Sequence, residues 1–295
     1  MQNFSIQFKA MGSHMQAWLS APSSRDAQIL TQVPDWFESW EAALSRFRPT
    51  SELSILNEHS GKWMPVSPLL FELIADAKDA AARTGGIFNP LILNALEAAG
   101  YERSFDPSAA AQQSSPAAQI EAIPSWERLL IDADRQAVFL PPGSRIDLGG
   151  IAKGWAAQET ADRLSDYGAC LVDAGGDLVA YGSPDENDGW IVTIPTLDES
   201  NTLFHILLVD EAIATSGTDY RQWQRDGQAM HHLIDPRTGR PSDSNIVRST
   251  VIAPDATEAV VWAKVSLMTQ QFSEYPTLFI QRDGVVQSNW EVQNS

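Results

Sequence analysis

The spacing of apolar residues along the chain predicts several helices. In 26–44 and 67–84, apolar side chains recur every three or four residues, which is the period of one helix face. Paired glycines in TGGIFNP are expected to stop the second of these helices. Ser51, just before the LSIL run, is a good N-cap for a shorter helical turn. The expected longer helices cover residues 26–44, 67–84, 152–167 and 257–269.

Between these helices lie apolar runs that predict strands. FSIQFKAMGSHMQAWLSA alternates apolar and polar residues around Met11-Gly12, which indicates two strands or one bulged strand. Further strands are expected at LLID, AVFLP, RIDLGG, ACLVDAGGDLVAYG, GWIVTIP, LFHILLV, EAIATSG and NIVRSTVIAP, with two more after the last helix. Because the strands cluster more than they alternate with helices, we expect an α+β fold with mixed or antiparallel sheets and packed helices.

The chain is expected to form a single domain over residues 1–295. Its 43% hydrophobic residues are ample for a large core. The stretch around 105–125 is rich in Ala, Ser, Gln and Pro. Because chemically suggestive motifs lie on both sides of it, we interpret it as a surface insertion and not as a linker between domains.

Charge and hydropathy exclude several functional classes. The formal net charge is −18 and there is no local basic patch, so nucleic acid binding is not expected. No apolar run of 18 residues occurs, so no membrane span is predicted. The first residues resemble neither a signal peptide nor a lipobox, which favours a cytoplasmic location. The lone cysteine, Cys170, permits no intrachain disulfide.

The segment Ile146-Asp147-Leu148-Gly149-Gly150-Ile151-Ala152-Lys153-Gly154 leads through glycines into a helix. Glycines let a ligand approach the backbone, and the N–H groups at a helix start favour an anion. Lys153 lies in the first turn, where the helix dipole disfavours a cation unless an anion is near. A tight turn with a solvated lysine is the alternative. The spacing fits neither a Walker A loop nor a GxGxxG fingerprint.

Three later segments also carry candidate chemistry. VDAGGD combines two glycines with two carboxylates, and the cluster around Ser216 can supply hydroxyl and backbone donors, although each could be an ordinary turn. In HHLIDPRTG, a histidine could act as a general base, and Asp235 could orient it or hold a turn. Adjacent histidines point to opposite faces of a strand, so His231 and His232 cannot form a HEXXH-type zinc site.

Taken in order, these segments resemble the ApbE family of FAD:protein FMN transferases. Met11-Gly12 is similar to an early MGT-like element of that family. SRFRPTSE with Asn57 is similar to its S-x-Y-x-P-x-S-E…N element, and GGIFNP to its GGxFDP element. DLGGIAKG, DAGGD, TSG-x-x-Y and HHLIDPRTG then follow in family order. The resemblance covers roughly residues 5 to 270 and rests on seven elements in sequence.

The resemblance implies a function and a set of site residues. FAD would be the substrate, bound at its diphosphate with the help of Mg²⁺. Its FMN half would pass to a Thr or Ser hydroxyl of an acceptor protein in trans, with release of AMP. His232 would be the base, with Asp235 also in the catalytic set, and the Gly150 carbonyl would face the metal. The implied FAD-binding residues are Met11, Phe47, Ile87, Phe88, Asn89, Asp147, Lys153, Ser216 and Leu233.

Three departures from the family pattern bear on this reading. Phe47 stands where the family usually has Tyr, and Asn89 stands where it has Asp. The metal element A-D-x-x-x-T is replaced by Ala259-Val260-Val261-Trp262-Ala263-Lys264. Valine cannot ligate Mg²⁺, which requires oxygen donors.

Several interpretations of this element stay open. A shifted alignment could recruit Glu258 or Asp255, and Lys264 could be a solvated helix residue. Alternatively, the Lys264 ammonium occupies the metal's place beside the diphosphate, which adds Lys264 to the FAD-binding residues. The functional alternative is an FAD-binding protein or FAD diphosphate hydrolase that has lost transfer with its metal site. A structural or interaction module on the same scaffold is the third possibility.

Overall fold

The computed structural model describes residues 1–104, 122–184, 188–225 and 227–290. Residues 105–121 of the expected insertion lie outside the described residues. The chain forms two compact units: the first contains residues 1–39, 153–216 and 245–295, and the second contains 40–152 and 217–244. The expectation of a single domain stays a prediction.

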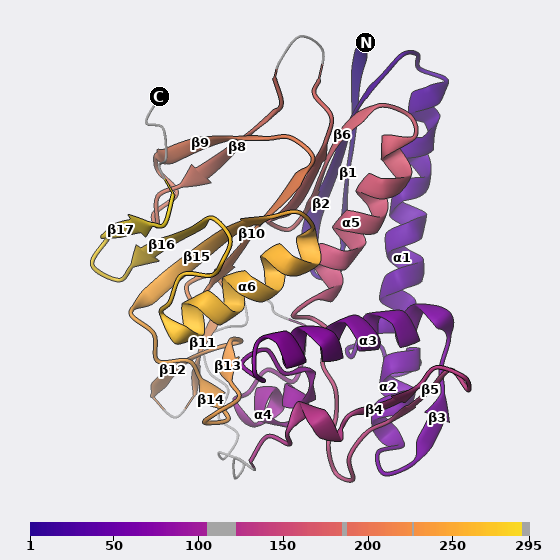
Figure 1. Cartoon of the computed structure of the whole chain (residues 1–295), viewed down its shortest axis with the longest axis vertical. Helices are drawn as coiled ribbons and strands as arrows, with labels where there is room; N and C mark the ends of the chain where they lie inside the picture. The colour runs from indigo at the N-terminus through magenta and orange to yellow at the C-terminus, as the bar shows by residue number, and fades with distance from the viewer. Residues whose placement is uncertain (105–121, 185–187, 226, 291–295) are drawn as a thin grey trace. The chain divides into compact units, whose positions relative to one another are not determined.

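An eight-stranded sheet forms the centre of the first unit (Figure 1). Its strand order is β1-β2-β6-β7-β10-β15-β16-β17. Neighbours from β1 to β10 pair antiparallel, as do β15 with β16 and β16 with β17. The strands are β1 (Gln2–Ala10), β2 (Ser13–Ala21), β6 (Ala169–Ala174), β7 (Asp177–Tyr181), β10 (Glu211–Gly217), β15 (Ile246–Ala253), β16 (Thr277–Gln281) and β17 (Val286–Ser288).

Helices and a hairpin cover the two faces of this sheet. The hairpin of β8 (Trp190–Pro195) and β9 (Thr202–Leu208) packs its buried side chains against Leu171 and Ala180. Because successive strand residues point to opposite faces, the buried neighbours Val172 and Val179 face the other side. That side carries α5 (Ala152–Ser165) and α6 (Ala256–Thr269) (Figure 1).

The expected helix over 26–44 is wrong as a single element. A 3₁₀ helix, η1 (Asp26–Gln32), precedes α1 (Val33–Leu44). Pro34 lies at the second position of α1, where its missing N–H is tolerated at a helix start but cannot continue an earlier helix. The apolar spacing still holds across the break, since Leu30 and Phe37 are both buried.

The second unit is built from short helices and small sheets. Ser51 caps α2 by accepting a hydrogen bond from the backbone of Ser54, as expected. Gly85 and Gly86 follow α3 with φ of 60° and 82°, so the paired glycines do end that helix. The helices are α2 (Glu52–Glu58), α3 (Pro68–Arg83), η2 (Pro90–Ile92), α4 (Leu93–Ala98) and η4 (Trp126–Arg128).

Small antiparallel sheets complete this unit. One has three strands in the order β3-β5-β4, and two hairpins pair β11 with β12 and β13 with β14. The strands are β3 (Trp63–Pro65), β4 (Leu130–Asp132), β5 (Ala137–Phe139), β11 (Gln222–Arg225), β12 (Gln228–His231), β13 (Ile234–Asp235) and β14 (Arg240–Pro241). Together with the first unit, these elements confirm the α+β fold class. Among the described residues, no helix is long and apolar enough to cross a membrane.

Candidate functional site

The segment expected as a strand at RIDLGG has no strand partner. The backbone of Ile146 instead bonds the Asn57 side chain twice, donating to Oδ1 at 2.7 Å and accepting from Nδ2 at 3.0 Å. The Asp147 N–H donates to the Pro90 carbonyl at 2.9 Å. These partners satisfy backbone N–H and C=O groups of the segment as a neighbouring strand would. The segment runs as a loop into α5. The strand prediction is therefore wrong here.

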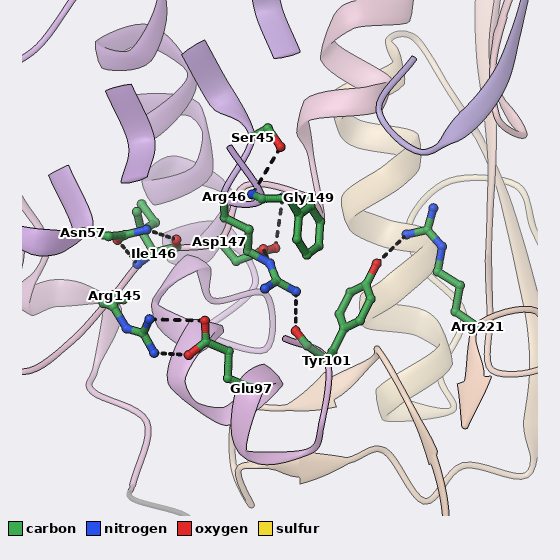
Figure 2. A network of polar contacts seen from close by, with 11 residues as sticks. Ser45, Arg46, Asn57, Glu97, Tyr101, Arg145, Ile146, Asp147, Gly149 and Arg221 are labelled. Carbon is green, nitrogen blue, oxygen red and sulfur yellow. Dashed lines mark hydrogen bonds and ion pairs between the residues drawn. The ribbon is translucent and has the colours of Figure 1, made fainter. Parts of the chain in front are cut away.

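The Asp147 side chain is held by two neighbours in this loop (Figure 2). Its Oδ1 accepts from the Gly149 N–H at 3.0 Å, and its Oδ2 lies 2.7 Å from Nε of Arg46. A Cβ added to Gly149 would lie 3.1 Å from the same Oδ1. Glycine at 149 thus leaves room for the carboxylate to fold back on its own turn.

Arg46 lies at the centre of this polar network (Figure 2). Besides Asp147, it donates from Nη2 to the Tyr101 carbonyl at 2.7 Å. The guanidinium also lies over the rings of Phe47 and Tyr101, 4.1 and 4.8 Å from their centroids. Its side chain is only 5% exposed. A buried, always-charged group with four such contacts fixes the positions of its neighbours.

An aromatic cluster continues from this arginine. The Tyr101 ring stacks on Trp223 at 5.5 Å between centroids and meets Phe47 edge-on at 5.8 Å. The His232 ring lies 6.4 Å from Tyr101. Arg221 donates to the Tyr101 hydroxyl at 3.5 Å (Figure 2). Tyr101 therefore links the loop of Phe47 to the segment of the candidate base.

Asp235 engages an arginine next to it in the chain. Its carboxylate accepts from the Arg237 guanidinium through both oxygens, at 2.7–3.1 Å, and from the Arg237 backbone at 2.9 Å. Burial raises the pKa of Asp235, but the hydrogen bonds and charge of Arg237 outweigh it and lower the pKa below its usual value. The Thr238 and Gly239 N–H groups donate to the Asp235 carbonyl. Of the two roles expected for Asp235, these contacts favour holding the turn.

The other expected residues of the second unit are mostly buried. Phe88, Asn89 and Leu233 are 7%, 7% and 3% exposed. Asn89 caps η2 by accepting from the Leu91 N–H and donates to the Pro124 carbonyl. Its amide thus uses both donor and acceptor, which a carboxylate at this position could not do.

In the first unit, the β1–β2 turn lies against the β6–β7 turn. Met11 and Gly12 have φ of 49° and 68°, which makes a tight two-residue hairpin turn. Gly175 has φ of 71°, and a Cβ there would lie 2.7 Å from the Cβ of Ser13. The glycine is required because the two turns approach each other so closely.

Lys153 points toward this pair of turns. Its Nζ lies 3.8 Å from Asp177 and 3.6 Å from the Cβ position of Gly175. Burial raises the pKa of Asp173, where the nearby Asp177 charge also raises it and Lys153 lowers it. Ser216 on β10 is 6% exposed. The first unit thus places a half-buried cation beside two carboxylates and two glycine turns.

The α6 element that departs from the family pattern packs tightly on α5. A Cβ on Gly154 would lie 2.6 Å from Cγ2 of Val260 and 2.9 Å from the Ala256 carbonyl oxygen. Val260 is 2% exposed. Lys264, one turn further along α6, donates from Nζ to the Val260 carbonyl at 3.2 Å. Val260 therefore fills the contact between the two helices.

The donor set of this element does not fit Mg²⁺. Asp255 caps α6 by accepting from the Glu258 N–H, and Glu258 accepts from Trp262 and Tyr275. Within the described residues, no group of three or more His, Cys, Asp or Glu side chains is placed to hold a metal ion. The role expected for the Gly150 carbonyl stays a prediction.

The structure brings together part of the expected set. Phe47 and Asp147 meet through Arg46, and Phe47 and His232 both contact Tyr101. Arg46 and Tyr101 were missed in the sequence analysis. An arginine in a loop and a tyrosine after a short helix carry no local signal of such pairing, although Arg46 does lie within the SRFRPTSE element.

Comparisons with known proteins point to one family. A sequence model of the ApbE family matches residues 10–284. An FAD:protein FMN transferase of Salmonella typhimurium is 30% identical over 272 residues, covering 87% of this chain and 76% of that protein. The protein of that name in Escherichia coli (strain K12) is 28% identical over 271 residues, with the same coverage.

Solved structures show the same fold. The ApbE protein of Thermotoga maritima aligns with a TM-score of 0.86 at 23% identity, over 97% of both chains. The flavinyl transferase ApbE of Pseudomonas stutzeri aligns with a TM-score of 0.81 at 22% identity, over 97% of this chain and 94% of that one. Because the family's sequence model spans nearly all of the sequence, this chain belongs to the ApbE family.

Proposed function

We propose that this chain is an FAD:protein FMN transferase. It binds FAD, transfers the FMN half to a Thr or Ser hydroxyl of an acceptor protein in trans, and releases AMP. The match of the ApbE family to residues 10–284 carries this proposal. Relatives named FAD:protein FMN transferase, 28–30% identical over most of the chain, support it.

The proposed step is a displacement at phosphorus. The acceptor hydroxyl oxygen attacks the phosphorus of the FMN half, and the bond from that phosphorus to the bridging oxygen breaks. The hydroxyl proton passes to His232, and the bridging oxygen leaves with AMP. Such a step needs an oriented nucleophile and charge neutralisation on the diphosphate.

Residues of each unit take parts in this proposal. In the second unit, Asp147 contacts the flavin nucleotide, while Phe47 offers a ring that is 38% exposed. Ile87 and the buried residues Phe88, Asn89 and Leu233 are proposed to line the FAD site in this unit. In the first unit, Lys153 lies in the first turn of α5, where an anion would offset its unfavourable position in the helix dipole. Met11 and Ser216 are proposed to contact FAD in the same unit.

A transfer assay tests the proposal directly. The protein is incubated with FAD and a threonine peptide of the D-G-x-[ST]-G-A type found in family acceptors, and AMP and a flavin-peptide adduct are measured. We expect both products, and we expect His232→Ala to abolish them while FAD binding persists. His205→Ala, an exposed histidine on β9, is the matched control. Full turnover by His232→Ala would remove His232 from the mechanism.

The same assay separates the alternatives. AMP without an adduct indicates an FAD diphosphate hydrolase, and FAD binding without AMP indicates a binding protein. A protein that does not bind FAD would contradict both readings. The specific support for these alternatives is the substituted element at Val260 and Lys264. The cytoplasmic location stays a prediction that cell fractionation can test.

We propose further that Lys264 supplies the charge that Mg²⁺ supplies in the family. Ala256, Val260 and Lys264 lie on one face of α6, spaced by four residues. The first two contact Gly154 near the start of α5, so this face leads toward the helix end that attracts anions. A cation about 4 Å from a phosphate contributes about 4 kcal/mol at an effective dielectric of about 20. Desolvation offsets much of that.

FAD binding with and without metal tests this substitution. Binding is followed by flavin fluorescence in EDTA and in Mg²⁺. We expect binding to survive EDTA in the natural chain and to weaken sharply in Lys264→Met. Lys78→Met, another helical lysine, is the control and should bind FAD as the natural chain does. Equal affinity in Lys264→Met, or loss of binding in EDTA, would refute the role of Lys264.

A further inference from the structure

We propose that Arg46 is a positioning residue for FAD, acting through Asp147 and Phe47. This inference rests on the proposed function, because it takes Asp147 and Phe47 as FAD contacts. It assigns to Arg46 the task of holding one carboxylate and one ring in the orientation that the ligand needs. Arg46 itself is not proposed to touch the reacting atoms.

Arg46 makes four contacts in different directions. The guanidinium forms an ion pair with Asp147, with Nε 2.7 Å from Oδ2, and donates a hydrogen bond from Nη2 to the Tyr101 carbonyl at 2.7 Å. Its flat face lies over Phe47 at 4.1 Å and Tyr101 at 4.8 Å. These four contacts use both the edge and the face of one planar group (Figure 2). A lysine ammonium has no such fork and no face to stack, so it cannot satisfy all of them at once.

These contacts orient the Asp147 carboxylate. One oxygen is fixed by Arg46 and the other by the Gly149 N–H. The carboxylate is 11% exposed. With one oxygen hydrogen-bonded and the other ion-paired, the orientation of the side chain is restricted, and each oxygen keeps lone pairs for a ligand donor. A ligand that bonds Asp147 therefore meets a pre-oriented acceptor.

Phe47 is partly open to solvent. The residue is 38% exposed although a buried guanidinium lies over its ring. The arginine holds the ring in place while leaving part of it open to solvent. An exposed aromatic ring held from within the protein is suited to a planar ligand such as a flavin or an adenine.

The same unit contains a second arginine that serves as a control. Arg145 donates to Glu97 through both terminal nitrogens (Figure 2). It also donates from Nε to the Asn94 side chain. Its side chain is 37% exposed, and its partner is 29% exposed. This pair has similar chemistry but includes none of the residues implied for FAD. Arg145→Lys therefore measures what loss of an arginine fork does to the fold alone.

The experiment compares Arg46→Lys, Asp147→Asn, their combination and Arg145→Lys. FAD affinity is measured by flavin fluorescence, kcat and KM by AMP release, and the fold by thermal unfolding. We expect Arg46→Lys to raise Kd and KM for FAD about tenfold, because Asp147 and Phe47 lose their fixed positions, and to change kcat much less. In the Asp147→Asn background, the same change should add little. Arg145→Lys should leave Kd and KM unchanged.

The outcomes separate this inference from the proposed function. If the natural chain does not bind FAD, the proposed function fails. If it binds FAD but Arg46→Lys binds equally well, or loses only thermal stability, the positioning role is overturned. Effects of Arg46→Lys and Asp147→Asn that simply add would also overturn it. If Arg46→Lys does not fold, Asp147→Asn carries the test, and unchanged FAD affinity there refutes the inference.

Discussion

Replacing Gly154 with alanine should destabilise the first unit, although alanine is the better helix former. Gly154 lies within α5, where Gly→Ala alone stabilises a helix by about 1 kcal/mol. The added Cβ would lie 2.6 Å from Cγ2 of Val260 and 2.9 Å from the carbonyl oxygen of Ala256. The first neighbour can rotate, but the second is backbone and can move only with α6.

The magnitude follows from these two opposing effects. Overpacking of a tight contact costs about 1–3 kcal/mol, and a backbone neighbour places this site at the upper end. After subtracting the gain in helix propensity, we expect a net loss of about 1–2 kcal/mol. Removing Cγ2 in Val260→Ala leaves only the contact with Ala256. The cost of Gly154→Ala should therefore fall by about half in that background, a coupling of about 0.5–1 kcal/mol.

Urea unfolding of the four proteins measures this cycle. The natural chain, both single variants and the double variant are compared at equal m-values, so that a change in midpoint reports stability. A Gly154→Ala protein as stable as the natural chain would refute the close approach of α5 and α6. An equal cost in both backgrounds would show that Val260 is not the neighbour that opposes the added methyl group.

Three further predictions concern single groups. Burial raises the pKa of Cys170 to about 12, with the nearby Asp162 also raising it, so a thiol reagent at pH 8 should label the unfolded but not the native protein. The lowered pKa of Asp235 contributes stability above its unfolded value of about 3.9, which is lost as the pH falls through the folded pKa. Arg237→Gln should therefore reduce the stability measured at pH 7 more than that at pH 2, and an equal loss at both would contradict this. Ser51→Ala should cost about 1 kcal/mol in urea unfolding through the lost cap of α2, and no loss would contradict the cap.

Local sequence signals predicted the elements of this fold well. The cap at Ser51 and the stop at Gly85-Gly86 depend on residues within a few positions of each other, so the sequence displays them directly. The break between η1 and α1 was missed because the apolar spacing continues across it. Pro34 was the available signal, since proline cannot continue a helix that began earlier.

Contacts between distant residues could not be predicted in the same way. The loop at Ile146 was expected as a strand because it is apolar, but its backbone is bonded by Asn57, 89 residues earlier. Arg46 contacts Tyr101 across 55 residues. One sequence contains no pattern that pairs these side chains, and only the tertiary structure brings them together. The motif residues, Asn57 and Arg46 among them, were recognisable, but the contacts by which they hold other residues in place were not.

The substituted element on α6 is explained only by its sequence and its contacts together. From the sequence, Val260 and Lys264 are two separate losses of oxygen ligands. In the structure they belong to one arrangement, because Val260 fills the contact at Gly154 and its carbonyl accepts from Lys264. A carboxylate at position 260 would be nearly fully buried and would need a cation beside it. Valine removes that need, and Lys264, one turn later, places a positive charge on the same helix face, where we propose that it acts in place of the metal.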